Sequence, residues 1–158
     1  MQSDNQEFMP CRQTKGSAGY DFYAPHDIEL GPDEWVTVNT GVRLQSREPV
    51  MMAFTTKLTP EIPEAVCEPY IPVGWFMILA PRSSLGIKYG LKFRNTIPVI
   101  DQDYRDYIKV TMKTEVPYTI EKGERFMQGI ILPFGVFTNE STPVKQRTGG
   151  FGSTGAKE

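Results

Sequence analysis

The sequence has few of the side chains on which most hydrolases and metalloproteins depend. Its 158 residues include two isolated cysteines, Cys11 and Cys67, without CxxC spacing, and a single histidine, His26. Zinc cages, cysteine–histidine nucleophile pairs and serine–histidine–aspartate triads need more ligands or bases than these. Any catalysis must therefore rest on carboxylates, arginines, hydroxyls and a metal bound through substrate oxygens.

Long apolar runs and blocks of one charge are also missing. The longest apolar run, Trp75–Ala80, is too short to span a bilayer, and residues 1–10 are polar rather than a basic and then apolar signal. Seventeen Lys and Arg against nineteen Asp and Glu give a net charge of −2 with no long block of either sign. We therefore expect a soluble, cytoplasmic protein with no nucleic-acid or membrane partner. This charge distribution is still compatible with a polyanionic small molecule as ligand.

Residues that interrupt helices are abundant. The 13 prolines and 14 glycines argue against an all-helical bundle. The chain has the usual length of one domain and is long enough to bury one sizeable core. These features predict a single compact domain that is not built from helices.

Short apolar runs separated by turn residues indicate strands. In Tyr107–Lys113, the residues Ile108, Val110 and Met112 alternate with polar ones, which is the period of a half-buried strand. Similar runs lie at Trp35–Leu44, Trp75–Ala80, Tyr118–Ile120 and Phe126–Phe137. Weaker signals indicate short helices at Ser84–Gly90 and Pro63–Tyr70. Many short strands with turns between them are typical of a sandwich, jelly roll or barrel.

Two segments combine groups that bind phosphate. Residues 147–155 join an arginine and hydroxyls to glycine-rich backbone, whose amides can turn toward an anion. The alternative is a frayed linker, but Phe151 favours a tail that covers a flat nucleobase. Arg82, Ser83 and Ser84 follow an apolar strand directly, where amides and hydroxyls face an anion, unless they form only a helix cap with a surface arginine.

Five segments, in order, resemble the five motifs of the trimeric dUTPase family. They are Ala18–Asp21, Pro81–Gly86, Val99–Arg105, Gly123–Arg125 with Gln128, and Arg147–Gly155, and the opening Pro10–Thr14 also resembles the first strand and turn of that family. The chain departs from the family pattern at four places. Pro98 and Asp106 stand where the family usually has glycine, the tail lacks one glycine after Arg147, and residues 45–72 are longer than the usual link.

The resemblance implies an all-β, jelly-roll-like dUTPase fold. Residues 1–146 would form the catalytic domain, with an insertion at about 45–72, and residues 147–158 a flexible, glycine-rich lid. The family hydrolyses dUTP to dUMP and pyrophosphate with Mg²⁺, which limits uracil incorporation into DNA and supplies dUMP for thymidylate synthesis. Its members are homotrimers with sites at the subunit interfaces, where the tail orders over a neighbour's site.

The resemblance also implies a role for each motif residue. Asp101 is the general base that orients and deprotonates the attacking water, rather than only a turn residue. Asp21 reaches Mg²⁺ through water, or else only hydrogen-bonds backbone. The expected phosphate contacts are Arg82, Ser83, Ser84, Gln128, Arg147, Ser153 and Thr154. Arg125 is expected either to contact a phosphate or only to brace the site.

Recognition of the base and sugar falls to a second set of residues. Backbone groups between about Asn95 and Tyr107, including Ile100, and the Asn95 side chain would pair with the uracil edge. Tyr104 would pack under the deoxyribose and leave no room for a 2′-hydroxyl, unless it is simply a core tyrosine. Phe151 would lie over the uracil as a lid.

Two alternatives share the fold. A dCTP deaminase also has an Arg-Ser-Ser motif, but it needs a glutamate ten residues after the aspartate, where this chain has Thr111. A regulatory binding protein would keep the fold and the nucleotide site, use residues 45–72 as an arm for a protein partner, and have lost catalysis. Pro98 and Asp106 favour that alternative, and a turnover assay with dUTP separates it from the enzyme.

Overall fold

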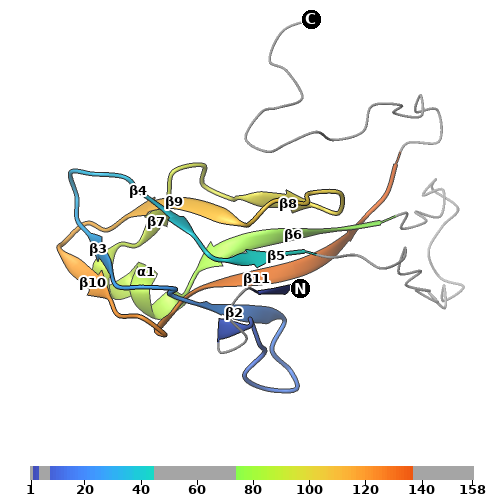
Figure 1. The fold of residues 1–158 in the computed structure, drawn as a ribbon, viewed down its shortest axis with the longest axis horizontal. Coiled ribbons are helices and arrows are strands. Elements are labelled where there is room, and N and C mark those ends of the chain that lie inside the picture. The colour runs from blue at the N-terminus through green and yellow to red at the C-terminus, as the bar shows by residue number, and fades with distance from the viewer. Residues whose placement is uncertain (1, 4–7, 45–73, 137–158) are drawn as a thin grey trace, which may run out of the picture.

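The computed structural model describes residues 2–3, 8–44 and 74–136 of the chain. Figure 1 shows that these residues form a mostly β structure with one short helix, which confirms the predicted all-β class. The helix α1 spans Ser83–Tyr89. The strands are β1 (Gln2–Ser3), β2 (Gly19–Tyr23), β3 (Ile28–Leu30), β4 (Val36–Asn39), β5 (Val42–Arg43), β6 (Gly74–Pro81), β7 (Lys92–Phe93), β8 (Val99–Asp101), β9 (Lys109–Lys113), β10 (Tyr118–Ile120) and β11 (Arg125–Phe134).

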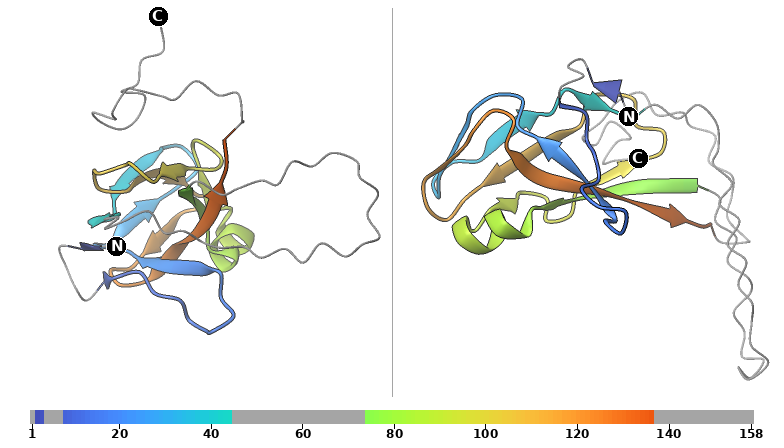
Figure 2. Two further views of the ribbon diagram at one scale, coloured as in Figure 1. Left: turned by 90° about the vertical axis from the view of Figure 1, so that its right-hand side faces the viewer. Right: turned by 90° about the horizontal axis from the view of Figure 1, so that it is seen from below.

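The strands pair in antiparallel sheets. The largest has the order β2-β11-β6-β8, and a second has the order β4-β9-β7, while β3 pairs with β10 and β1 with β5. In Figure 2 the long strands β6 and β11 run side by side and extend past the rest of the fold. No helix within the described ranges is long and apolar enough to cross a membrane.

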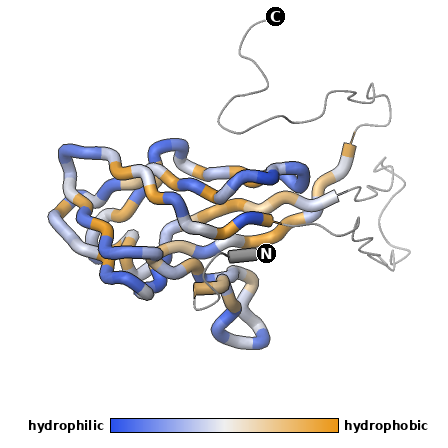
Figure 3. Tube along the Cα trace, in the orientation of Figure 1, coloured by the Kyte–Doolittle hydropathy of each residue, from blue (hydrophilic) through white to orange (hydrophobic). Residues whose placement is uncertain are grey.

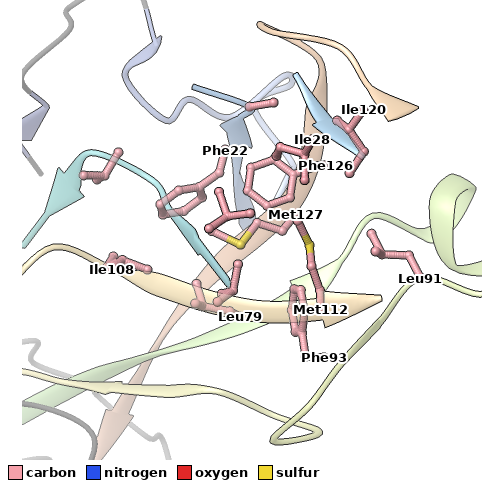
Figure 4. Packing of buried hydrophobic residues seen from close by; sticks show 14 of the residues in the cluster. Phe22, Ile28, Leu79, Leu91, Phe93, Ile108, Met112, Ile120, Phe126 and Met127 are labelled. Atoms are coloured by element: carbon pink, nitrogen blue, oxygen red, sulfur yellow. The ribbon is translucent and has the colours of Figure 1, made fainter. Parts of the chain in front are cut away.

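The core lies between the sheets and follows from the alternation along each strand. Ile108, Val110 and Met112 are at most 2% exposed, which confirms the predicted inward face of this segment, although β9 itself begins at Lys109. Figure 4 shows Phe22, Phe126, Met127 and Met112 packed together, and Figure 3 shows the alternation of apolar and polar residues along the strands. Burying each such side chain contributes about 1.5–3 kcal/mol.

Several predicted elements differ from the observed ones at their ends. The run Trp35–Leu44 is divided into β4 and β5, because Gly41 takes a left-handed φ of 68°. The buried Thr40 hydroxyl supports this turn by donating to the Ile108 carbonyl at 2.9 Å. The predicted helix Ser84–Gly90 starts one residue earlier and ends before Gly90, whose φ of 66° caps it.

Of the three-residue strands, β10 has its predicted bounds, whereas β3 and β8 were not predicted. Three residues are too few to show a period against the surrounding turns. Pro98, one departure from the family pattern, precedes the edge strand β8, where its missing amide costs no ladder bond and its carbonyl accepts the Leu79 amide at 3.0 Å. The predicted helix Pro63–Tyr70, the insertion 45–72 and the tail 147–158 lie outside the described residues.

Candidate functional site

One polar hollow gathers residues from three distant segments. Its volume is about 250 Å³, and the described residues that line it are Asp21, Arg82, Ser83, Ser84 and Gln128. The pairing of β11 with both neighbours places Gln128 opposite Asp21 on β2 and opposite Ala80 on β6. Because directly paired residues share one face of a sheet, the structure brings five predicted site residues together.

The first turn of α1 supplies the hydroxyl groups of this hollow. Arg82 is the N-cap residue with extended backbone (ψ 136°), and no side-chain cap hydrogen bond is found for this helix in the described part of the chain. Ser83 and Ser84 are exposed. Arg82 therefore occupies the N-cap position, whereas the alternative to a phosphate site placed a serine there. The hydroxyls of Ser83 and Ser84 are available to a ligand.

Asp21 is the buried acid of the hollow. Its side chain is 12% exposed and pairs with two guanidinium groups, Arg125 Nη1 at 3.1 Å from Oδ2 and Arg82 Nε at 3.8 Å from Oδ1. Arg82 Nη1 also donates to the Arg125 carbonyl at 3.4 Å. Two cations beside one carboxylate leave an excess of one positive charge, which suits an anionic ligand.

Gly19 makes room for the Gln128 carboxamide. A Cβ at Gly19 would lie 2.5 Å from Gln128 Oε1 and 3.2 Å from its Cβ. A larger residue at this position would require the Gln128 carboxamide to shift. Gly19 belongs to the motif Ala18–Asp21, but only the pairing of β2 with β11 shows what its missing side chain permits.

A second, larger hollow surrounds Asp101. Its volume is about 680 Å³, and it is lined by Phe76, Val99, Asp101, Gln102, Asp103, Arg105 and Phe134. Asp101 ends β8 and lies opposite Phe76 near the start of β6. The loop after it is held by its own hydrogen bonds, from Tyr104 N to Asp101 O at 3.1 Å and from Arg105 Nη1 to Gln102 O at 2.7 Å.

The described residues predicted to contact base and sugar are not among those that line this second hollow. Tyr104 is 6% exposed, packs with the core and donates its hydroxyl to the Tyr107 carbonyl at 3.0 Å. The Ile100 side chain is also in the core, so a ligand would meet its backbone. Asn95 is exposed in the turn between β7 and β8, where its carbonyl accepts the Ile97 amide at 2.6 Å. Arg147, Phe151, Ser153 and Thr154 lie outside the described residues.

The two hollows lie at opposite ends of β6. Asp101 pairs with Phe76, whereas Arg82 follows Pro81 at the other end of the strand. Pro81 is five residue steps along the extended strand from Phe76, a distance of about 17 Å. A group bound by Arg82, Ser83 and Gln128 is therefore beyond hydrogen-bond reach of Asp101 in the same chain.

Two tyrosines outside these hollows have raised pKa values. Burial, followed by the hydrogen bond to Glu124, raises the pKa of Tyr118 to about 12. The hydrogen bond to Cys11, followed by burial, raises the pKa of Tyr23. Among the described residues no group of three or more His, Cys, Asp and Glu side chains is placed to hold a metal ion.

Comparisons with known proteins agree on one family. Residues 51–155 match the family model described as dUTPase. A deoxyuridine 5'-triphosphate nucleotidohydrolase of Lactococcus lactis subsp. lactis is 32% identical over 157 residues, which cover 94% of this chain and 88% of that protein. The crystal structure of dUTPase from Streptococcus mutans has a TM-score of 0.61 at 28% identity, covering 87% of this chain and 94% of that one.

A likeness at lower identity concerns the fold alone. A mutant dUTPase from phage phi11 of S. aureus has a TM-score of 0.59 at 20% identity, covering 89% of this chain and 92% of that one. Its structure is described as showing the coordination of a structural Mg(II) ion.

Proposed function

The chain belongs to the dUTPase family, and from this membership we propose that it is a dUTP diphosphatase that releases dUMP and pyrophosphate. The observation that carries the proposal is the polar hollow in which Asp21, Arg82, Ser83, Ser84 and Gln128 meet from three separate segments. The Arg82 guanidinium and the two serine hydroxyls of this lining match the charge and hydrogen-bonding needs of a triphosphate.

The phosphate contacts are assigned to the residues that line this hollow. Arg82 supplies a charge-assisted fork, Ser83 and Ser84 donate hydroxyl hydrogen bonds, and the Gln128 amide nitrogen donates a further one. Arg125 is held against Asp21 and braces the hollow from the side. From the tail, Arg147, Ser153 and Thr154 are proposed to close over the phosphates, and Phe151 over the base.

The donor set fits a magnesium ion that is held mainly by substrate. Asp21 is the one carboxylate among the described residues that line the polar hollow, and Gln128 and the two serines supply the other side-chain oxygens of this lining. Mg²⁺ keeps several waters and prefers phosphate oxygens to an all-protein cage. Asp21 would therefore accept hydrogen bonds from waters bound to the ion. When bound, the ion neutralises phosphate charge and orients the triphosphate.

Asp101 is assigned the role of general base. Its carboxylate takes a proton from a water whose oxygen bonds to the α-phosphorus, and the bond from that phosphorus to the bridging oxygen breaks to leave pyrophosphate. Because Asp101 sits at the end of a paired strand and its carbonyl accepts the Tyr104 amide, its position is fixed before substrate arrives. The Asn95 side chain and the Ile100 backbone would pair with uracil, and Tyr104 would lie against the deoxyribose.

The separation of the two hollows supports sites shared between subunits of a homotrimer. Asp101 and the phosphate hollow can act on one nucleotide only if they come from different chains. The outer face of the sheet between them is apolar, with Ile78 and Ile130 paired across β6 and β11, and with Val99 53% exposed and Leu132 36% exposed. A neighbouring subunit would cover this face.

A nucleotide panel tests the proposed function. With Mg²⁺ present, we expect rapid release of pyrophosphate from dUTP and little from UTP, dTTP or dCTP. The panel also tests the regulatory alternative, because tight binding of dUTP without turnover would contradict the enzyme. Comparable turnover of all four nucleotides would contradict the assigned base and sugar contacts.

Replacing Gly19 with alanine is expected to lower kcat/KM for dUTP about tenfold, the scale of one lost hydrogen bond to a charged group. The new Cβ would lie 2.5 Å from Gln128 Oε1 and 3.2 Å from Gln128 Cδ, so the carboxamide must leave its present position. Gly16→Ala is the matched control, because a Cβ there has no heavy atom within 4 Å. Steady-state kinetics of both variants, with melting temperatures, gives the comparison, and equal activity of the two would contradict the role given to Gly19.

A further inference from the structure

Asp106 holds a backbone group in the loop that carries Asp101 and Tyr104. Its Oδ1 accepts the Tyr107 amide at 2.7 Å, and its Oδ2 lies 3.3 Å from Lys109 Nζ. The amide hydrogen bond, followed by the one from Lys109, lowers the pKa of Asp106, so this carboxylate is charged at neutral pH. Each oxygen of Asp106 thus has its own partner.

Tyr107 connects this carboxylate to Tyr104. Its amide is held by Asp106, and its carbonyl accepts the Tyr104 hydroxyl at 3.0 Å. The Arg43 guanidinium lies 5.5 Å from the centre of the Tyr107 ring, and the next residue, Ile108, donates its amide to Val42 at 2.8 Å. Tyr107 therefore links Asp106 to Tyr104 by one hydrogen bond on each side. The residue that follows it, Ile108, is hydrogen-bonded to the neighbouring β5.

We propose that Asp106, oriented by Lys109, is a positioning residue that fixes the Tyr104 ring and thereby sets the preference for deoxyribose over ribose. The inference rests on the proposed function, since the sugar contact of Tyr104 belongs to it. Asp106 stands where the family resemblance leads one to expect glycine. A glycine has no side-chain acceptor for the Tyr107 amide, so this chain has a contact of its own at this point.

The exposure of the pair argues for a local effect rather than a stabilising one. The side chains of Asp106 and Lys109 are 52% and 33% exposed, and such ion pairs contribute little to the stability of a fold. Rejection of a 2′-hydroxyl, by contrast, depends on a ring that stays in place when a larger sugar presses on it. Loss of the hydrogen bond to the Tyr107 amide would allow Tyr107 to move together with its carbonyl, which accepts the Tyr104 hydroxyl. The Tyr104 ring could then yield to that sugar.

The test compares three variants by their kcat/KM for dUTP and for UTP. Asp106→Ala removes the acceptor and is expected to lower the dUTP-to-UTP ratio about threefold to tenfold, the scale of one exposed charge-assisted hydrogen bond. Asp106→Asn keeps an Oδ1 acceptor for the Tyr107 amide and should stay close to wild type. Asp33→Ala removes an exposed carboxylate from a distant turn and should leave the ratio unchanged.

Three results would overturn the inference. They are an unchanged ratio in folded Asp106→Ala, an equal fall in efficiency with both nucleotides, and an Asp106→Asn variant that behaves like the alanine variant. Failure of the proposed function is seen separately, as a wild-type protein that does not hydrolyse dUTP. In that case the same ratio is measured from the binding affinities for dUTP and UTP, so the role of Asp106 is tested either way.

Discussion

Replacing Asp101 with asparagine is expected to lower the turnover of dUTP by about 100-fold or more, the usual scale of a general base. Asparagine keeps the shape of the side chain but cannot accept a proton from the attacking water. The Asp101 backbone is held by its pairing with Phe76 and by the Tyr104 amide, and neither contact uses the carboxylate. Because asparagine is nearly isosteric with aspartate, the variant should fold normally and bind a non-hydrolysable dUTP analogue almost as tightly as the wild type.

Single-turnover kinetics and titration calorimetry separate these two effects. Asp33→Asn is the matched control, because Asp33 is an exposed aspartate in the turn before β4, outside both hollows. Wild-type turnover in the Asp101 variant would remove this residue from the mechanism. A parallel loss of affinity and turnover would instead indicate that the carboxylate binds the nucleotide.

Mixing two inactive variants is expected to restore activity. One variant is Asp101→Asn, and the other is Arg82→Ala, which removes a phosphate contact but leaves Asp21 paired with Arg125. If each site takes Asp101 from one subunit and the phosphate hollow from its neighbour, a mixed trimer contains sites in which both parts are intact. With random mixing of equal amounts, about a quarter of all sites should be fully functional, which corresponds to about one site in three within each mixed trimer.

The mixing experiment needs evidence of exchange and a control pair. The variants are co-refolded with different affinity tags, and the mixed trimers are isolated before pyrophosphate release is measured. Asp101→Asn mixed with the double variant Asp101→Asn/Arg82→Ala is the control, because every site in it lacks the base. No recovery in confirmed mixed trimers would contradict sites shared between chains, and so would recovery in the control pair.

The sequence predicted the strands that show a clear period. The alternation at Ile108, Val110 and Met112 and the apolar run Trp75–Ala80 both became strands close to their predicted bounds. Among the three-residue strands, β10 was predicted with its observed bounds, but β3 and β8 were not, because three residues cannot show a period and such strands are defined by their partners. The division of Trp35–Leu44 into two strands depended on the positive φ of Gly41. It allows a turn in which the Thr40 hydroxyl donates to the Ile108 carbonyl.

The chemistry of the candidate site was also available from the sequence. The arginine and hydroxyls of the Arg82 segment indicated an anionic ligand, and the family resemblance added Asp21 and Gln128. The structure gathers these side chains in one hollow. The sequence did not show that Arg125 pairs with Asp21, that Gly19 makes room for Gln128, or that Asp106 holds Tyr107. Each of these contacts depends on pairing or packing around the residue concerned.

The sequence by itself determined which reactive groups this protein has, because a carboxylate, a guanidinium or a hydroxyl has its chemistry wherever the chain places it. The tertiary structure alone decided how these groups are divided between two places. Asp101 lies opposite Phe76 and Arg82 follows Pro81, so the intervening length of β6 holds the base and the phosphate hollow apart. That separation follows from the register between strands distant in sequence, which is fixed by the burial of their inner faces and cannot be recognised from any one segment.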